Sequence, residues 1–292
     1  MGNCTGFCVG NNQEDKHQRI TAEAVQTAVK DQDYHYNMEQ SNQGLEDRRY
    51  LSARESRPAI TMSNGAVYTG EWLGDKKDGK GTQKWPDGSI YSGDWRDDKA
   101  NGYGKLMHAD GDIYEGEWLN DKAHGRGKYK HSNGATYEGE WQFDKQHGQG
   151  VETWPDGAKY EGHYVEGKKD GHGTLTFADG SVYVGTFQQN EINGEGKYFW
   201  PDKKNYSGSW LKNKMHGRGI LIWADGKKYE GEFVNDKREG YGVFTWKDGR
   251  VYKGSWKDGK QHGRGVFVDK NQQEKQGEWQ YGRKIRWLSD DS

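Results

Sequence analysis

A stretch of 23 residues recurs along most of this chain of 292 residues, and that repeat limits what the chain can fold into. Residues 68–90 read YTGEWLGDKKDGKGTQKWPDGSI, and the pattern begins again at Tyr91. Nine copies begin with Tyr, and a tenth has Lys275 in that place. Glycine follows two residues later and an aromatic residue two further on. A fixed period of this kind predicts a repeat architecture in which each copy is stabilised by its neighbours.

Alternation within each copy predicts strands. Residues i, i+2 and i+4 of a strand point to one face, so the Tyr, Gly and aromatic residue of each copy share a face. The glycine leaves room that neighbouring rings can cover. A second strand follows, in which Gly79 and Gly81 share a face with Gln83 and Trp85. The chain holds 13 Trp and 18 Tyr among only 30% hydrophobic residues, which indicates a core built from aromatic rings.

The connections also fit strands. Asp-Gly or Asn-Gly precedes most copies, and these dipeptides are the strongest short signal for a hairpin turn. Asp202-Lys203 breaks that rule, so its turn is expected to differ. A longer polar connection, such as residues 73–78, is expected inside each copy. About ten hairpins side by side would form an all-β antiparallel meander spanning roughly 95 Å at about 4.8 Å per strand.

These motifs resemble a known family. YxGxW, a following GxG pair and a DG turn at 23-residue spacing are similar to the MORN repeat (membrane occupation and recognition nexus), over about residues 64–281. The resemblance implies an elongated, curved, single-layered β-sheet and roles in scaffolding, membrane attachment and cytoskeletal organisation. It also implies a protein partner, in some relatives a helix laid in the aromatic groove. The groove expected here is lined by Tyr68, Trp72, Tyr91, Trp95, Tyr114, Trp118, Tyr137, Trp141, Tyr160, Tyr183, Tyr206, Trp210, Tyr229, Tyr252 and Trp256.

The sequence predicts four segments: a lipidation segment at 1–12, a polar, partly helical spacer at 13–57, the repeat array at 58–281 and a tail at 282–292. Helices are expected at 18–30 and at 45–57, the second ended by Pro58. The last copy is atypical, with Asn271-Gln272 in place of the turn dipeptide. Atypical ends protect an open sheet edge, so we expect a cap there; a homodimer contact through an array end is the alternative.

The N-terminus MGNCTGFC predicts lipidation. Gly2 after Met1 is required for N-myristoylation, although the usual motif has Ser or Thr at position 6 and this chain has Gly6. One myristoyl chain binds membranes weakly, so a second anchor is needed. Cys4 and Cys8, the two cysteines of the chain, are the candidates for palmitoylation. The alternatives are a chance Met-Gly start with inert cysteines, or half of a metal site.

Composition and motifs argue against several functions. The formal net charge of −2 gives no pull toward nucleic acid. No apolar run approaches the roughly 20 residues that cross a bilayer. His124, His147, His216 and His262 share one repeat position and are expected in loops, without metal-ligand spacing. The GxG pairs lack the rest of a phosphate-binding loop. We therefore expect no enzyme, no metal and no cofactor.

The sequence favours a scaffold tethered to the cytoplasmic face of a membrane, plasma or ciliary, that presents its aromatic groove to a protein partner. The alternative is a soluble cytoskeletal or axonemal structural protein without a lipid anchor. Direct phosphoinositide binding by the repeats would need a basic stripe. Seven of the 43 basic and nine of the 45 acidic residues lie in 1–57, which leaves 36 of each in the repeat region. A neutral array is poorly suited to anionic lipid.

Overall fold

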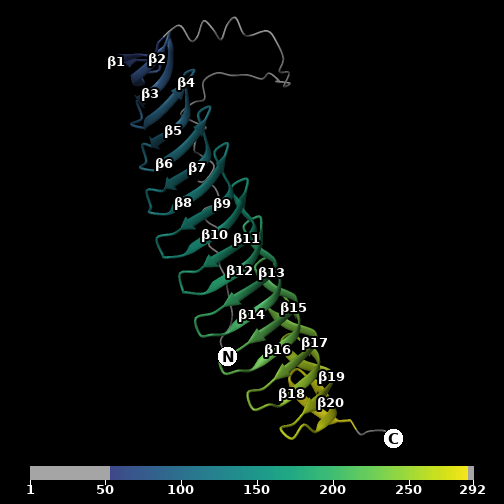
Figure 1. The fold of residues 1–292 in the computed structure, drawn as a ribbon. Helices are drawn as coiled ribbons and strands as arrows, with labels where there is room; N and C mark the ends of the chain where they lie inside the picture. The colour runs from purple at the N-terminus through teal and green to yellow at the C-terminus, as the bar shows by residue number, and fades with distance from the viewer. Residues whose placement is uncertain (1–52, 289–292) are drawn as a thin grey trace, which may run out of the picture. The chain divides into compact units, whose positions relative to one another are not determined.

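The computed structural model describes residues 53–288, which are almost entirely β-strand. These residues divide into two units, 53–155 and 156–288. In each unit the strands follow one another as hairpins in chain order (Figure 1). The segment predicted to be lipidated, and the helices predicted at 18–30 and across 45–52, lie outside the described residues.

Every strand pair in residues 53–155 is antiparallel and joins neighbours in the sequence. The strands of this unit are β1 (Glu55–Thr61), β2 (Val67–Leu73), β3 (Lys76–Lys84), β4 (Ile90–Arg96), β5 (Lys99–Met107), β6 (Ile113–Leu119), β7 (Lys122–Lys130), β8 (Thr136–Gln142) and β9 (Lys145–Thr153).

Residues 156–288 repeat the same arrangement, again with antiparallel pairs between sequence neighbours. The strands are β10 (Lys159–Val165), β11 (Lys168–Thr176), β12 (Val182–Gln188), β13 (Glu191–Phe199), β14 (Asn205–Leu211), β15 (Lys214–Ile222), β16 (Lys228–Val234), β17 (Lys237–Thr245), β18 (Val251–Lys257), β19 (Lys260–Val268), β20 (Glu274–Gln280) and β21 (Arg283–Trp287).

The prediction of one hairpin per repeat is confirmed, but the tight turn lies elsewhere than expected. Inside each repeat only two residues join the strands: Leu73 pairs with Lys76, so Gly74 and Asp75 form the turn. Later copies place Asn or Asp there with positive φ, as at Asn120 (φ 50°) and Asp121 (φ 66°). Positive φ at both central residues is the geometry that matches the twist of paired strands. The longer connection predicted at 73–78 is therefore wrong.

The Asp-Gly dipeptides lie in five-residue connections such as 85–89. Gly88 has φ +97°, and its N–H donates to the carbonyl oxygen of Trp85 at 3.0 Å, so the dipeptide does form a turn. The prediction that Asp202-Lys203 would differ is wrong. Lys203 adopts φ 71°, and its N–H donates to Trp200 in the same way. The surrounding strands impose the left-handed conformation on a residue that does not favour it.

The core consists of tyrosine rings lying on glycines. The Tyr68 ring covers Gly81 of the paired strand, where an added Cβ would meet the ring at 2.5 Å from Cζ. An added Cβ on Gly70 would meet the Lys80 carbonyl oxygen at 2.5 Å. The tyrosine hydroxyl donates to the carbonyl oxygen three residues on, as Tyr68 does to Glu71 at 3.0 Å. The glycine spacing predicted as room for rings is confirmed as such.

Both ends of the described chain differ from the predicted boundaries. The strand β1 begins at Glu55, inside the segment expected to be spacer, and it passes through Pro58, where a helix was expected to end. Edge strands tolerate proline because one side of the strand makes no ladder hydrogen bonds. The strand β21 lies in the expected tail and pairs with β20. Its role as the predicted cap is taken up below.

Candidate functional site

The fifteen aromatic residues predicted to line a partner groove form the core of the aromatic face. Each is at most 5% exposed, and Tyr68, Tyr114 and Tyr229 have no exposed surface. The Tyr and Trp rings alternate edge to face: Tyr91 lies 5.0 Å from Trp95 and 5.3 Å from Trp118 of the next repeat. We call these two rows the aromatic ladder. The ladder as a partner groove stays a prediction; the structure places its rings in the interior.

Polar atoms of the ladder bind the backbone of the adjacent repeat. The indole N–H of Trp118 donates to the carbonyl oxygen of Gly104 at 3.1 Å, and Trp256 does the same to Gly242. A buried indole needs such a partner. Where the repeat carries Trp at this position, as at Trp95, Trp118, Trp141, Trp210 and Trp256, a hydrogen bond joins it to its neighbour in addition to the strand ladder.

Cations lie over the ladder in some repeats. Lys77 is 8% exposed, and its Nζ lies 3.9 Å from the Trp95 ring centroid and donates to Gln83 at 2.7 Å. Burial lowers the pKa of Lys77 to about 8. The Arg238 guanidinium lies 4.3 Å from the Trp256 ring centroid. These cations pack against the ladder rings and are part of the interior of the aromatic face, because an aromatic ring attracts a cation held over it.

A second aromatic row on the same face was not among the predicted site residues. Its members in residues 156–288 are part-exposed and follow the second strand of each hairpin: Phe177, Trp200, Trp223 and Trp246. Two of these rings pack against an aromatic side chain two residues earlier in the chain. The ring centroid of Trp200 lies 4.4 Å from that of Tyr198, and the ring centroid of Trp246 lies 4.8 Å from that of Phe244. The period-2 alternation that placed Trp85 beside Gln83 was the signal that could have identified this row.

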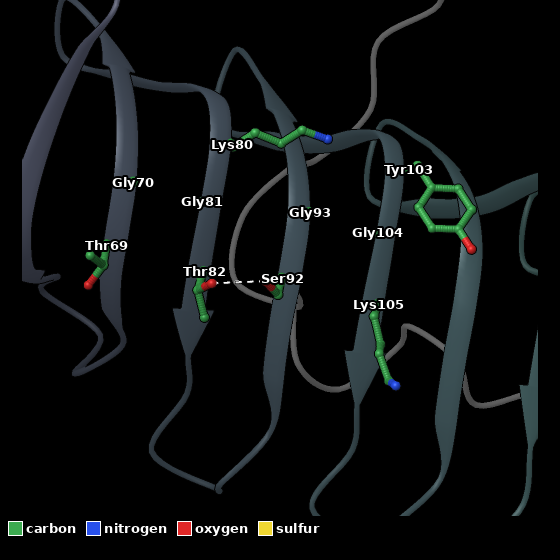
Figure 2. Close-up of a pocket in the computed structure, with 10 residues that line it drawn as sticks. All are labelled: Thr69, Gly70, Lys80, Gly81, Thr82, Ser92, Gly93, Tyr103, Gly104 and Lys105. Carbon is green, nitrogen blue, oxygen red and sulfur yellow. Dashed lines mark hydrogen bonds between the residues drawn. The ribbon is translucent and has the colours of Figure 1, made fainter.

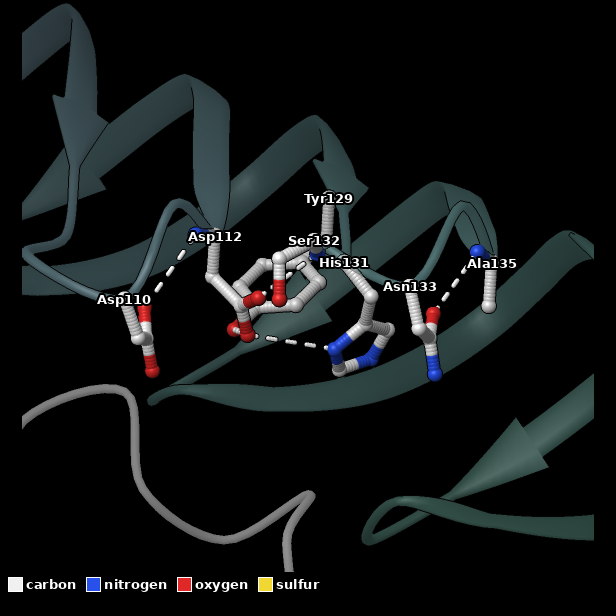
Figure 3. Close-up of polar contacts among 7 residues, drawn as sticks. All are labelled: Asp110, Asp112, Tyr129, His131, Ser132, Asn133 and Ala135. Carbon is white, nitrogen blue, oxygen red and sulfur yellow. Dashed lines mark hydrogen bonds and ion pairs between the residues drawn. The ribbon is translucent and has the colours of Figure 1, made fainter.

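In residues 53–155 the same positions hold Trp85, His108, His131 and Trp154. His131 and Tyr129, which lies two residues before it on β7, both bind Asp112 (Figure 3). The Tyr129 hydroxyl donates to Asp112 Oδ2 at 2.6 Å, His131 Nδ1 lies 3.1 Å from the same oxygen, and the Ser132 N–H donates to Oδ1 at 2.8 Å. Burial alone would raise the pKa of Asp112, but these hydrogen bonds lower it overall. The cluster joins two neighbouring connections, because Asp112 lies in the connection 108–112, and His131 and Ser132 lie in the connection 131–135.

The opposite face carries a shallow hollow of about 480 Å³ across β2–β5 (Figure 2). Its floor is the backbone of four glycines: Gly70, Gly81, Gly93 and Gly104. Its polar side chains are paired with one another or with the rim: Thr82 with Ser92 at 2.9 Å, Lys80 with Asp94 at 2.6 Å, and Lys105 with Glu115 at 3.3 Å. The hollow therefore offers hydrogen-bonding groups that are already satisfied.

The two-residue turns join successive repeats. These contacts come in reciprocal pairs. The side chain of the second turn residue accepts a hydrogen bond from a backbone N–H of the preceding repeat. The backbone N–H of the turn residue donates in return to the carbonyl oxygen of that same residue. Asp121 accepts from Ala100 N at 2.7 Å and donates to Ala100 O at 3.0 Å. The remaining pairs of this turn ladder are Asp98 with Lys77, Asp144 with Ala123, Asn190 with Lys169, Asn213 with Ile192, and Asp236 with Met215.

Replacing Asp121 with alanine is expected to lower the free energy of unfolding by about 1–2 kcal/mol, because the Ala100 N–H loses its side-chain partner. Burial raises the pKa of Asp121, so the carboxylate itself is not favoured there. Asp121→Asn, which copies Asn190 and Asn213, should keep the stability within about 0.5 kcal/mol. Urea unfolding of the two variants measures this. Equal losses in both would show that the charge, and not the acceptor, matters.

The remaining predicted residues are not gathered into a site. Gly2, Cys4 and Cys8 lie outside the described residues. His124, His147, His216 and His262 lie on β7, β9, β15 and β19. The expectation that they are loop residues is wrong, because the turn before them has only two residues. In residues 53–288, no three His, Cys, Asp or Glu side chains are placed to hold one metal ion. No helix within that range is long and apolar enough to span a bilayer.

Comparison with solved structures finds chains of low similarity. The TCP domain of SAS-4 from Drosophila melanogaster, solved with a proline-rich motif of Ana2, shares 16% identity over 61% of this chain and 90% of its own, with a TM-score of 0.34. The TCP10 domain of CPAP from Danio rerio shares 14% identity over 79% of this chain and 99% of its own, with a TM-score of 0.39. We take no function from either. A comparison with curated proteins finds no match.

A protein-family model matches most of the repeat array. The model described as "MORN repeat" matches nine segments, and every one of them starts 23 residues after the one before it. The segments are 68–90, 91–113, 114–136, 137–159, 160–182, 183–204, 206–228, 229–249 and 252–273. Each coincides with one hairpin, with its Tyr in the aromatic ladder and the second glycine of its GxG pair beneath the tyrosine ring. The match covers well over half of the chain, and the chain therefore belongs to the MORN repeat family.

Proposed function

We propose that this MORN-repeat scaffold has no enzymatic activity and is held at the cytoplasmic face of a membrane, plasma or ciliary, by acyl chains on Gly2, Cys4 and Cys8. The array presents its aromatic face to a protein partner. The observation that carries the scaffold role is the part-exposed second row at Trp200, Trp223 and Trp246, which lies above a fully packed ladder.

The packing indicates where a partner would bind. The ladder rings are covered, whereas the second row leaves part of each ring open to solvent. Lys204 Nζ lies 4.0 Å from the Trp200 ring centroid, and the Arg250 guanidinium lies 5.5 Å from that of Trp246. Large, amphipathic rings with a cation beside them are the usual anchors of protein interfaces. The partner, a helix in our proposal, would therefore contact the second row, with the predicted ladder as its rigid support.

A photo-crosslinking amino acid at position 223 should capture the partner in cells, because its ring projects from the aromatic face. The matched control is the same amino acid at Arg264, which is exposed on the opposite face of the same unit. The measurement is the pattern of crosslinked bands on a denaturing gel, followed by mass spectrometry. Bands that occur equally at both positions, or at Arg264 alone, would place the partner off the aromatic face.

Labelling cells with a clickable myristate analogue tests the anchor. We expect the wild-type chain to take the label and to sediment with membranes, and Gly2→Ala to lose both, because myristate is joined to the α-amino group of an N-terminal glycine. A Cys4→Ser/Cys8→Ser variant should keep the label but return to the soluble fraction, because one acyl chain binds a membrane only weakly. The ratio of membrane to soluble protein should fall about tenfold or more.

Two outcomes separate the alternatives. A wild-type chain without label, found in a detergent-insoluble cytoskeletal fraction, supports the soluble cytoskeletal or axonemal scaffold. Liposome binding that persists after residues 1–12 are removed would mean that the repeats themselves bind lipid. A homodimer through an array end stays a prediction.

A further inference from the structure

The strand β21 is an open edge. Among the described residues it pairs with β20 on one side only, and all five of its residues are exposed. An edge strand presents unpaired N–H and C=O groups on its outer side, which can pair with another extended chain. The Leu288 N–H donates inward to the Gln276 carbonyl oxygen at 2.9 Å. The preceding N–H, that of Trp287, therefore points outward, since these groups alternate along a strand.

The edge is held in place by its inner contacts. The Trp287 ring lies 6.0 Å from Trp279 and 6.1 Å from Phe267, at the end of the aromatic rows. This packing supports the prediction that the last strand caps the array. The cap is incomplete, however, because Trp287 stays 41% exposed, Ile285 55% and the turn residue Tyr281 53%. An extended chain that paired with β21 would cover these apolar surfaces.

The charge of this edge indicates which kind of extended chain could pair with it. Residues 274–288 contain four cations, Lys275, Arg283, Lys284 and Arg286, against two acids, Glu274 and Glu278. Both acids are already engaged: Glu278 pairs with Arg286 at 2.8 Å, and Glu274 of β20 pairs with Lys253 of β18, on the far side of β19, at 2.9 Å. The Arg283 and Lys284 side chains are exposed on the edge strand itself, with Lys284 Nζ 4.1 Å from the Trp287 ring centroid.

The strand β1 at the N-terminal edge of residues 53–155 differs in two ways. It contains Pro58, which cannot donate to a ladder and blocks pairing at that residue. Its charges are also balanced, because Arg57 pairs with Glu55 and donates to the Gly74 carbonyl oxygen at 2.8 Å. Proline is an ordinary protection of an edge. The strand β21 has no proline, and its charge is of one sign.

We propose that β21 accepts, by strand addition, an extended segment of a protein partner that alternates acidic and apolar residues. A second copy of β21 is a poor occupant, because antiparallel self-pairing would bring Arg283, Lys284 and Arg286 against the same cations, and like charges directly opposite one another destabilise a strand pair. The same cations attract an acidic strand, and the apolar residues of that strand would cover Ile285 and Trp287. This site is separate from the aromatic face and does not depend on the acyl anchor.

The probe is a fluorescein-labelled peptide of sequence EVEVEVE, titrated with the full chain and followed by fluorescence anisotropy. We expect saturable binding, no binding of the matched KVKVKVK peptide, and a loss of affinity with added salt. Hydrogen exchange measured with and without the peptide should show new protection of the Trp287 amide. Equal binding of the two peptides, or protection elsewhere but not on β21, would overturn the proposal.

Charge reversal supplies the second test. Arg283→Glu/Lys284→Glu should raise the Kd of the EVEVEVE peptide about tenfold or more, while Lys212→Glu/Lys214→Glu, the same charge change at exposed positions of the same unit, should leave it within about twofold. Equal urea midpoints of the two variants show that both fold. An unchanged Kd in the first variant contradicts the proposal. So does a chain that is dimeric by light scattering with its β21 amides already protected, since a second copy would then occupy the edge.

Discussion

Replacing Gly116 with alanine is expected to lower the free energy of unfolding of its unit by about 4 kcal/mol or more. Losses of this size are exceptional and occur where the surrounding core cannot move to accept an added group. The added Cβ would lie 2.6 Å from the Arg126 carbonyl oxygen and 2.8 Å from the Tyr114 hydroxyl, and closer still to the Cα of Gly127. Two of these three groups are backbone of the paired strand. The hairpin could accept the methyl group only by separating its strands, which would also uncover the Tyr114 ring.

The control is Gly88→Ala in the same unit. Gly88 has φ +97° and nothing within 4 Å of an added Cβ, so the cost is conformational only, about 1–2 kcal/mol. Urea unfolding followed by circular dichroism compares the two variants. Equal losses would mean that backbone conformation, and not the close approach of the strands, makes glycine necessary in the repeat.

The repeat array should unfold between about pH 10 and pH 12. Burial raises the pKa of Tyr183, Tyr198 and Tyr252 from 10.0 to about 12 each. In the unfolded chain these hydroxyls lose their protons near pH 10, so above that pH the folded state holds more protons and its stability falls as pH rises. Each shift is worth about 2.7 kcal/mol, and the three together about 8 kcal/mol. That is comparable with the whole stability of a domain.

Phenolate absorbance near 295 nm and circular dichroism, recorded in one alkaline titration, measure this expectation. The phenolate signal of the buried tyrosines should rise together with the loss of β-sheet signal, because all three side chains are at most 1% exposed. The Tyr183 and Tyr252 hydroxyls also donate to backbone carbonyl oxygens. A phenolate transition that is complete near pH 10 while the circular dichroism is unchanged would mean that the rings are accessible in the folded chain.

Much of the fold could be predicted from the sequence, because the same alternation of tyrosine, glycine and aromatic residues recurs in about ten copies. Tyr, Gly and Trp at alternate positions can share a face only in a strand, and a glycine beside every tyrosine leaves space that a ring can fill. The structure confirms both at Tyr68, Gly70 and Gly81. The turns were misplaced because Asp-Gly is the stronger local signal, whereas the tight turn uses Asn and Asp whose side chains bind the neighbouring repeat. That partner is 21 residues away in the sequence, beyond the reach of a local pattern.

The candidate site shows the same division. The sequence identified the ladder rings but could not say whether they face a partner or the interior. The alternating pattern predicts on which face of a strand a side chain lies, but it does not predict whether another part of the chain covers that side chain. The cover comes from the next repeat, whose Trp95 packs 5.3 Å from Tyr68 and binds Gly81. On the aromatic face of residues 156–288, rings of the second row, at Trp200, Trp223 and Trp246, are accessible in consequence, one step further along the strands.

By itself the sequence determined the period, the alternation of rings and glycines and the family, since each of these is a relation between residues near one another in the chain. Only the tertiary structure decided which rings are buried, how the turns join one repeat to the next and which end strand stays open. The burial of the rings and the joining of the turns depend on contacts between repeats, as from Trp118 to Gly104, 14 residues away, and from Asp121 to Ala100, 21 residues away. Burial is a property of the stacked repeats, because a single hairpin has no neighbour with which to cover its rings.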